Sequence, residues 1–200
     1  MIDPGHGGKD PGNLDGIAQE KRYTLLLANE LRQMLQKTPI KVGLTRSTDK
    51  SVDLDLRPAL ARQMRADLFI SLHFNSAPGP KNSVRGIEMY CLTPAGAAST
   101  NGRGESDSRA YPGNQWDPKN MLLAFQLQKS LVQSLGVEDR GIKRARWAVL
   151  LSAEMPAVLI EGGFMTDSSD ASRIYSPAQR RQFAQAVVDG LLAYKRLVER

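Results

Sequence analysis

Residues 2–12 read Ile-Asp-Pro-Gly-His-Gly-Gly-Lys-Asp-Pro-Gly and contain His6, one of two histidines in the chain of 200 residues. The four glycines and two prolines of this stretch predict a loop, because glycine is costly to order and proline has no amide hydrogen to donate. Glycines beside a histidine also let backbone or a ligand approach the imidazole closely. By itself, His6 would be interpreted as a solvated histidine in a surface turn.

Three further residues favour a different interpretation. Glu20 begins a helical pattern, His73 follows the apolar run 68–72, and Glu161 follows the apolar run 158–160. Two imidazoles and one carboxylate are a common ligand set for catalytic zinc, with the fourth position left to water or substrate. A second carboxylate that does not bind the metal is then suited to carry a proton. The structural alternatives are a solvated acid in the first helical turn for Glu20 and a buried, hydrogen-bonded histidine for His73.

Six blocks in order along the chain resemble the zinc-dependent N-acetylmuramoyl-L-alanine amidases that trim bacterial cell walls. They are residues 2–12, 20–21, 44–46, 66–75, 140–145 and 156–164. The resemblance implies that His6, Glu20 and His73 hold one zinc ion and that Glu161 is the general base. It also implies that the substrate is peptidoglycan and that the bond cleaved joins the lactyl group of N-acetylmuramic acid to L-alanine of the stem peptide.

Two other functions remain open at this point. A zinc carboxypeptidase or another peptidase acting on stem peptides would use similar ligands, and a wall-binding module would need no catalysis. For the amidase we expect a monomer, a location in the cell envelope, the periplasm or outside the cell, and possible dependence on a protein activator.

The composition narrows the range of partners. An excess of Lys and Arg gives a net charge of +6, which suits any polyanion. No nucleic-acid-binding motif accompanies the charge, so we expect no nucleic acid partner. No apolar run is long enough to span a membrane. Cys91 lies in an apolar segment, and we interpret it as a small buried side chain rather than a nucleophile.

The alternation of helical and strand patterns predicts one α/β domain over residues 1–200. We expect a three-layer sandwich with a mostly parallel sheet of about five or six strands. Strands are predicted at about 40–44, 68–72, 86–91, 147–151 and 156–161, and helices at about 20–36, 53–65, 120–135, 168–174 and 177–197. A strand that leads into the loop at His6 should be about 5 residues long. We therefore expect this catalytic domain to be excised from a longer chain whose upstream part carries any export signal.

Other polar residues are candidates for substrate contacts. Asn75 follows His73 and could bind substrate or cap a loop, and Arg144 belongs to a basic turn over 140–146 that either contacts an acidic group or is solvated. Arg46 and Arg57 either hold a substrate carboxylate by bidentate contact or, as we expect, hold loops at the edge of the sheet. The stretch 93–119 is predicted to border the groove, with its acids away from the metal. These acids are Glu105, Asp107 and Asp117.

Overall fold

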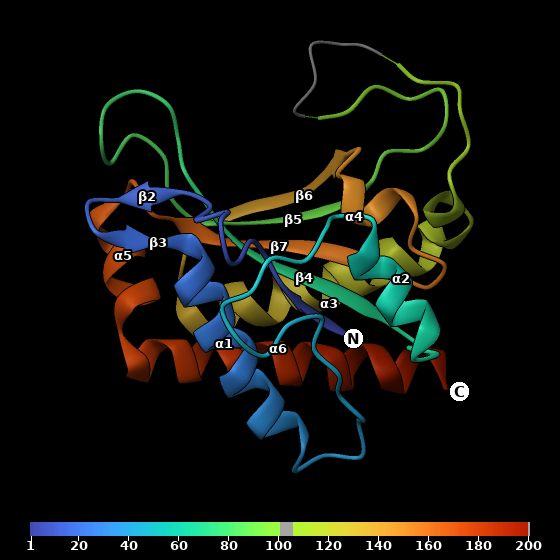
Figure 1. Cartoon of the computed structure of the whole chain (residues 1–200), viewed down its shortest axis with the longest axis horizontal. Helices are drawn as coiled ribbons and strands as arrows, with labels where there is room; N and C mark the ends of the chain where they lie inside the picture. The colour runs from blue at the N-terminus through green and yellow to red at the C-terminus, as the bar shows by residue number, and fades with distance from the viewer. Residues whose placement is uncertain (101–105, 200) are drawn as a thin grey trace.

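The computed structural model describes residues 1–100 and 106–199 and shows a central sheet with helices on both faces (Figure 1). The sheet has five strands in the order β1-β4-β7-β5-β6. Their bounds are β1 Ile2–Pro4, β4 Phe69–Asn75, β7 Ala157–Phe164, β5 Ile87–Leu92 and β6 Asp139–Ala145. Strands β1, β4 and β7 are parallel, β5 runs antiparallel to β7, and β6 is parallel to β5. The predicted mostly parallel α/β sheet is confirmed.

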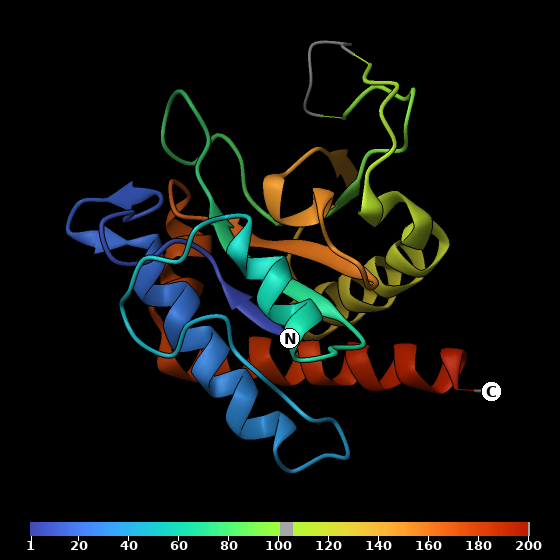
Figure 2. The same cartoon turned by 45° about the vertical axis from the view of Figure 1, so that its right-hand side comes forward.

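The helices form the two outer layers. Their bounds are α1 Glu20–Leu35, α2 Leu56–Gln63, α3 Asp117–Leu135, α4 Ala148–Leu151, α5 Ser168–Tyr175 and α6 Pro177–Val198, with a 3-10 turn at Pro112–Trp116. Helices α1, α3 and α6 pack on one face of the sheet, and α2 and α4 cover part of the other. Figure 2 shows α6, in red, running beneath the sheet with α1, in blue, beside it.

Alternation along β4 assigns its side chains to the two faces. Ile70, Leu72 and Phe74 belong to the larger core under α1 and α6, while Phe69 belongs to the smaller core under α2 and α4. His73 comes four residues after Phe69, so its side chain lies on the same face of the sheet as that of Phe69. The smaller core ends before His73, so the histidine lies where the sheet is only partly covered.

The predicted strand at 40–44 is wrong, because the segment pairs with β1 only through the isolated bridge of Leu44 with Ile2. The amide of Ile2 donates to Gly43 (2.9 Å), and the amide of Thr45 donates to Ile2 (3.1 Å). Strand β1 is three residues long and ends at Pro4. It therefore offers too short an edge for a regular ladder.

The predicted basic turn and the strand at 147–151 are also wrong. Arg140, Lys143 and Arg144 lie in strand β6, Arg146 follows it, and residues 148–151 form helix α4. A short apolar run does not distinguish a buried strand from a buried helix. Strand β6 has a single neighbour in the sheet and is mostly half-buried, which lets it carry charged side chains.

Strand β7 continues to Phe164 instead of turning away after Glu161. The continuation includes an irregularity in its pairing with β4, and Gly163 has a φ of 125°. This left-handed backbone is accessible to glycine at little cost. A short two-stranded hairpin, β2 Leu14–Asp15 with β3 Ala18–Gln19, precedes α1.

Candidate functional site

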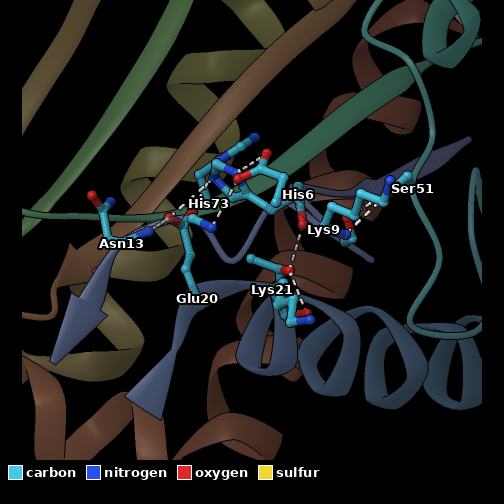
Figure 3. Close-up of polar contacts among 12 residues, drawn as sticks. His6, Lys9, Asn13, Glu20, Lys21, Ser51 and His73 are labelled. Atoms are coloured by element: carbon cyan, nitrogen blue, oxygen red, sulfur yellow. Dashed lines mark hydrogen bonds and ion pairs between the residues drawn. The ribbon is translucent and has the colours of Figure 1, made fainter. Parts of the chain in front are cut away.

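The structure brings His6, Glu20 and His73 together, although they are far apart in the sequence (Figure 3). His6 Nε2 lies 3.1 Å from Glu20 Oε2, and His73 Nδ1 lies 2.9 Å from Glu20 Oε1. The two imidazole nitrogens, His6 Nε2 and His73 Nδ1, are 3.1 Å apart. Ligand atoms of a tetrahedral zinc ion are separated by about 3.3 Å, given Zn–N distances of about 2.0–2.1 Å. The three side chains therefore fit a zinc ion in both chemistry and spacing.

Neighbouring strands position two of these residues. The pairing of β1 with β4 aligns Pro4 with Leu72, and the amide of Gly5 donates to Leu72 at 3.0 Å. His6, just past β1, therefore lies beside His73 at the carboxyl ends of two parallel strands. Polar sites collect at this edge of an open α/β sheet. Glu20 reaches the same edge as the first residue of α1.

Glycines make room for the cluster. A Cβ atom on Gly5 would lie 2.3 Å from His73 Cε1. A Cβ atom on Gly12 would lie 2.6 Å from both Glu20 Oε2 and His6 Cδ2. Both separations are shorter than real contacts, so these two positions need glycine for space.

Backbone amides hold the carboxylate of Glu20, which is fully buried. The amide of Asn13 donates to Oε2 at 2.9 Å and that of Phe74 donates to Oε1 at 3.0 Å. Burial by itself would raise the pKa of Glu20, but hydrogen bonds with His6 and His73 outweigh it and lower that pKa. The carboxylate is thus ionised and able to bind a cation.

Asp10 orients His6 from the outer side. Its Oδ2 lies 2.7 Å from His6 Nδ1, leaving Nε2 directed at Glu20. Burial lowers the pKa of His6, but hydrogen bonds to Glu20 and Asp10 outweigh it and raise that pKa. A carboxylate on the outer nitrogen of a metal-binding histidine fixes the ring and its tautomer.

Two buried arginines anchor the loop that carries His6, as predicted. Arg46 donates to the carbonyl oxygens of Pro4, Gly5 and Lys21 at 2.7–2.9 Å. Arg57 donates to Asp3 and to the carbonyl oxygen of Pro4, each at 2.9 Å. Both guanidinium groups are therefore engaged by the loop itself.

Glu161 lies on β7 directly beside His73, its partner on β4, and Glu88, its partner on β5. Its Oε2 atom is buried and has no hydrogen-bond partner among the described residues. Burial, followed by the charges of Glu20 and Glu88, raises the pKa of Glu161 well above its usual value. A carboxylate in this environment is a stronger base than that of an exposed glutamate.

Glu88, a buried acid in the middle of the site, was not predicted from the sequence. It accepts hydrogen bonds from Lys143 Nζ at 2.5 Å, Arg140 Nε at 2.7 Å and Tyr90 Oη at 3.0 Å. An acid within the apolar segment 87–92 was the available signal. A buried carboxylate needs cationic or polar partners, so its position indicates a polar network.

The two predicted substrate contacts lie in different places. Asn75 Nδ2 is 3.3 Å from Glu88 Oε2, and Asn75 Oδ1 accepts from the amide of Ser76 at 2.8 Å. Arg144 is paired with Asp117 and donates to the carbonyl oxygen of Leu92 at 2.9 Å. The structure thus places Asn75 beside Glu88 in the site, whereas Arg144 is paired with Asp117 outside it.

Two of the three acids in the stretch 93–119 are also engaged away from the histidines. Asp117 pairs with Arg144, and Asp107 pairs with Arg109 at 2.8 Å. Glu105 lies outside the described residues. Residues 93–100 and 106–111 of this stretch rise on the side of the sheet opposite α6 in both views (Figures 1 and 2).

The fold and the ligand set define an α/β domain with a candidate hydrolytic metal centre. The family model described as N-acetylmuramoyl-L-alanine amidase matches residues 1–193, so the chain belongs to this family. None of the described helices has the length and apolar character needed to cross a membrane.

Two relatives with similar sequences are named as N-acetylmuramoyl-L-alanine amidases, in agreement with this family. The chain is 33% identical to N-acetylmuramoyl-L-alanine amidase LytC of Bacillus subtilis, over 98% of this chain and 35% of LytC. It is 30% identical to N-acetylmuramoyl-L-alanine amidase AmiC of Neisseria meningitidis, over 97% of this chain and 52% of AmiC. The chain therefore spans about a third to a half of these two proteins.

A solved structure shares the fold. The crystal structure of N-acetylmuramoyl-L-alanine amidase from Clostridium difficile 630 superposes with a TM-score of 0.81 at 32% identity. The match covers 96% of this chain and 94% of that one. The likeness thus extends over the whole α/β domain.

Proposed function

We propose that residues 1–200 form a single catalytic domain that acts as a zinc-dependent N-acetylmuramoyl-L-alanine amidase. The bond cleaved is the amide between the lactyl group of N-acetylmuramic acid and L-alanine of the peptidoglycan stem peptide. The observation that carries this proposal is the convergence of His6, Glu20 and His73 beside Glu161, in a chain that belongs to the amidase family.

The metal ligands are His6, Glu20 and His73, which supply two imidazole nitrogens and one carboxylate. A zinc ion bound there would polarise the amide carbonyl and lower the pKa of a water molecule. Contacts within the protein hold these ligand atoms in place. Asp10 holds the ring of His6, and two backbone amides hold the carboxylate of Glu20.

Glu161 is the general base and then the general acid. Its buried Oε2 receives a proton from the attacking water and returns it to the nitrogen of the leaving amine. The raised pKa of Glu161, caused first by burial, makes its carboxylate a stronger base than that of an exposed glutamate. The position of Glu161 beside His73 in the sheet puts it next to the ligand set.

The proposed substrate places the activity in the cell envelope or outside the cell. In support, a Staphylococcus epidermidis protein named probable cell wall amidase LytH is 32% identical over 97% of this chain. The CwlD amidase of Clostridioides difficile was solved in complex with the GerS lipoprotein. At 21% identity CwlD is a guide to the fold alone, so an activator of this chain stays a prediction, as does the monomeric state.

Digestion of purified, cross-linked peptidoglycan by the zinc-loaded chain tests the proposal. An amidase releases intact stem peptides with a free N-terminal L-alanine and leaves the glycan strands whole. Shortened peptides still attached to glycan would instead identify a peptidase. Binding to the wall without any release would identify a wall-binding module. Addition of a chelator should stop the release, and restoring zinc should restart it.

A further inference from the structure

A row of ionisable side chains crosses four adjacent strands of the sheet. It starts at His73 on β4, continues to Glu161 on β7 and Glu88 on β5, and ends at Lys143 and Arg140 on β6. Adjacent strands are about 4.8 Å apart, so the backbone of β6 is about 14 Å from that of β4, while the charged groups of Lys143 and Arg140 reach back to Glu88 on β5. The metal ligands are thus at one end of the row and the cations at the other.

The cations at this end of the row outnumber the carboxylates that pair with them. Burial would raise the pKa of Glu88, but hydrogen bonds from Lys143, Arg140 and Tyr90 outweigh it and lower that pKa, so Glu88 is ionised. Glu138 lies 3.6 Å from Arg140 and 3.5 Å from Arg85. Three cations therefore share the two carboxylates that pair with them, because the neighbouring Asp139 accepts from Gln128 and from the amide of Gly141 instead.

The two cations are held in position yet reach solvent. The side chains of Lys143 and Arg140 are 22% and 27% exposed. The guanidinium group of Arg140 lies 5.3 Å from the ring centroid of Phe164, which restricts its orientation. An ammonium group has three N–H donors, and among the described residues Lys143 Nζ gives one of them to Glu88.

The other two basic residues of this strand region do not share the arrangement. Arg144 pairs with Asp117, and Arg146 donates to the carbonyl oxygen of Ala97 at 2.7 Å. Both therefore hold the segment that follows β5. Of the four basic residues that the sequence places together, Lys143 and Arg140 are the pair that joins the row of the site.

We infer that Lys143 and Arg140 form a subsite that binds a carboxylate of the stem peptide, with Glu88 as the residue that positions both cations. The inference rests on the proposed function, which puts the scissile amide between the metal ligands and Glu161. From Glu161 to β6 is two strand spacings, about 10 Å, and an extended peptide covers about 3.3 Å per residue. A carboxylate within the first three residues of the leaving peptide can therefore reach the subsite.

Binding of the free stem peptide to the zinc-loaded chain tests the subsite without any hydrolysis. Calorimetry would compare a peptide that keeps its carboxylates with the same peptide fully amidated. We expect the wild-type chain to bind the acidic form about tenfold more tightly, as for one charged hydrogen bond. Lys143→Met should remove most of this preference, and Lys143→Arg should retain it.

Lys195→Met is the matched control, because it removes the same charge from the far end of α6 and should keep the full preference. If Lys143→Met fails to fold because Glu88 loses a partner, Glu88→Gln combined with Lys143→Met removes both charges and should also lose the preference. Equal binding of both peptides by the wild type, or full preference in a folded Lys143 variant without the charge, would overturn the subsite. Failure to release peptides from whole wall would instead overturn the proposed function.

Discussion

Glu161 combines a buried carboxyl oxygen with two acidic neighbours, Glu20 and Glu88, that raise its pKa. Replacing it with glutamine keeps the shape and removes the proton carrier. We expect Glu161→Gln to lower the turnover rate by roughly 10²–10⁴-fold while zinc remains bound. His73→Ala should lose both zinc and activity. Rates of peptide release and metal analysis of the purified variants check this, and near-normal turnover by Glu161→Gln would refute the role.

Gly12 and Gly16 allow a matched test of the space around the metal ligands. Both have left-handed backbone, with φ of 67° and 58°, but only Gly12 has Glu20 and His6 within 3 Å of an added Cβ atom. Each change to alanine should cost roughly 1–2 kcal/mol of backbone strain. Gly12→Ala should also weaken zinc binding, whereas Gly16→Ala should not. Equal zinc affinity in the two variants would show that the loop relaxes around the added methyl group.

At the scale of the element, Arg46 connects the loop after β1 to the start of α1. It is almost fully buried and donates to the carbonyl oxygens of Gly5 in the loop and Lys21 in α1. Arg46→Met should lower the free energy of unfolding by roughly 1.5–3 kcal/mol, because buried acceptors lose a charged donor. Arg62→Met, in an exposed ion pair with Glu154, should cost less than about 1 kcal/mol. Urea unfolding of both variants measures the two losses of unfolding free energy. Equal losses in the two variants would show that the loop repacks without Arg46.

Strands β5 and β6 are joined by the ion pairs of Glu88, and this contact should depend on pH. The pKa of Glu88 is lower in the folded chain than its usual value. Its ionisation therefore stabilises the fold above the usual glutamate pKa of about 4.3, and the contribution is lost as the pH falls through the folded pKa. The difference in the free energy of unfolding between wild type and Glu88→Gln should therefore shrink as the pH falls from roughly 6 to roughly 3, because Glu88 becomes protonated. A stability difference that stays constant over this pH range would contradict the role of Glu88 in joining β5 and β6.

At the scale of the whole molecule, Cys91 reports on the integrity of the larger core. It is fully buried, and burial raises the pKa of its thiol to about 12. The thiol should therefore resist a thiol reagent in native buffer and react when the chain unfolds globally. Thiol reactivity followed along a urea titration should coincide with the loss of helical signal. Rapid reaction of the native chain would show that the sheet opens locally at β5.

Particular segments show what could be predicted for the fold. The apolar runs before His73 and Glu161 predicted two strands, and the structure places them side by side as β4 and β7. The residues of β6 were not predicted as a strand, because their charges balance the buried acid Glu88 on a neighbouring strand. The pattern of neighbouring residues along the chain does not show that Glu88 will pair with Lys143 and Arg140.

By itself, the sequence determined the α/β class, the glycine loop and the four residues His6, Glu20, His73 and Glu161 as candidates, because turn chemistry and apolar periodicity are local. Only the tertiary structure decided that Glu88 lies beside Glu161, and that Lys143 and Arg140, rather than Arg144, join this row. The physical reason is that strand order and register, set by long-range packing, decide which charges are neighbours in the folded chain.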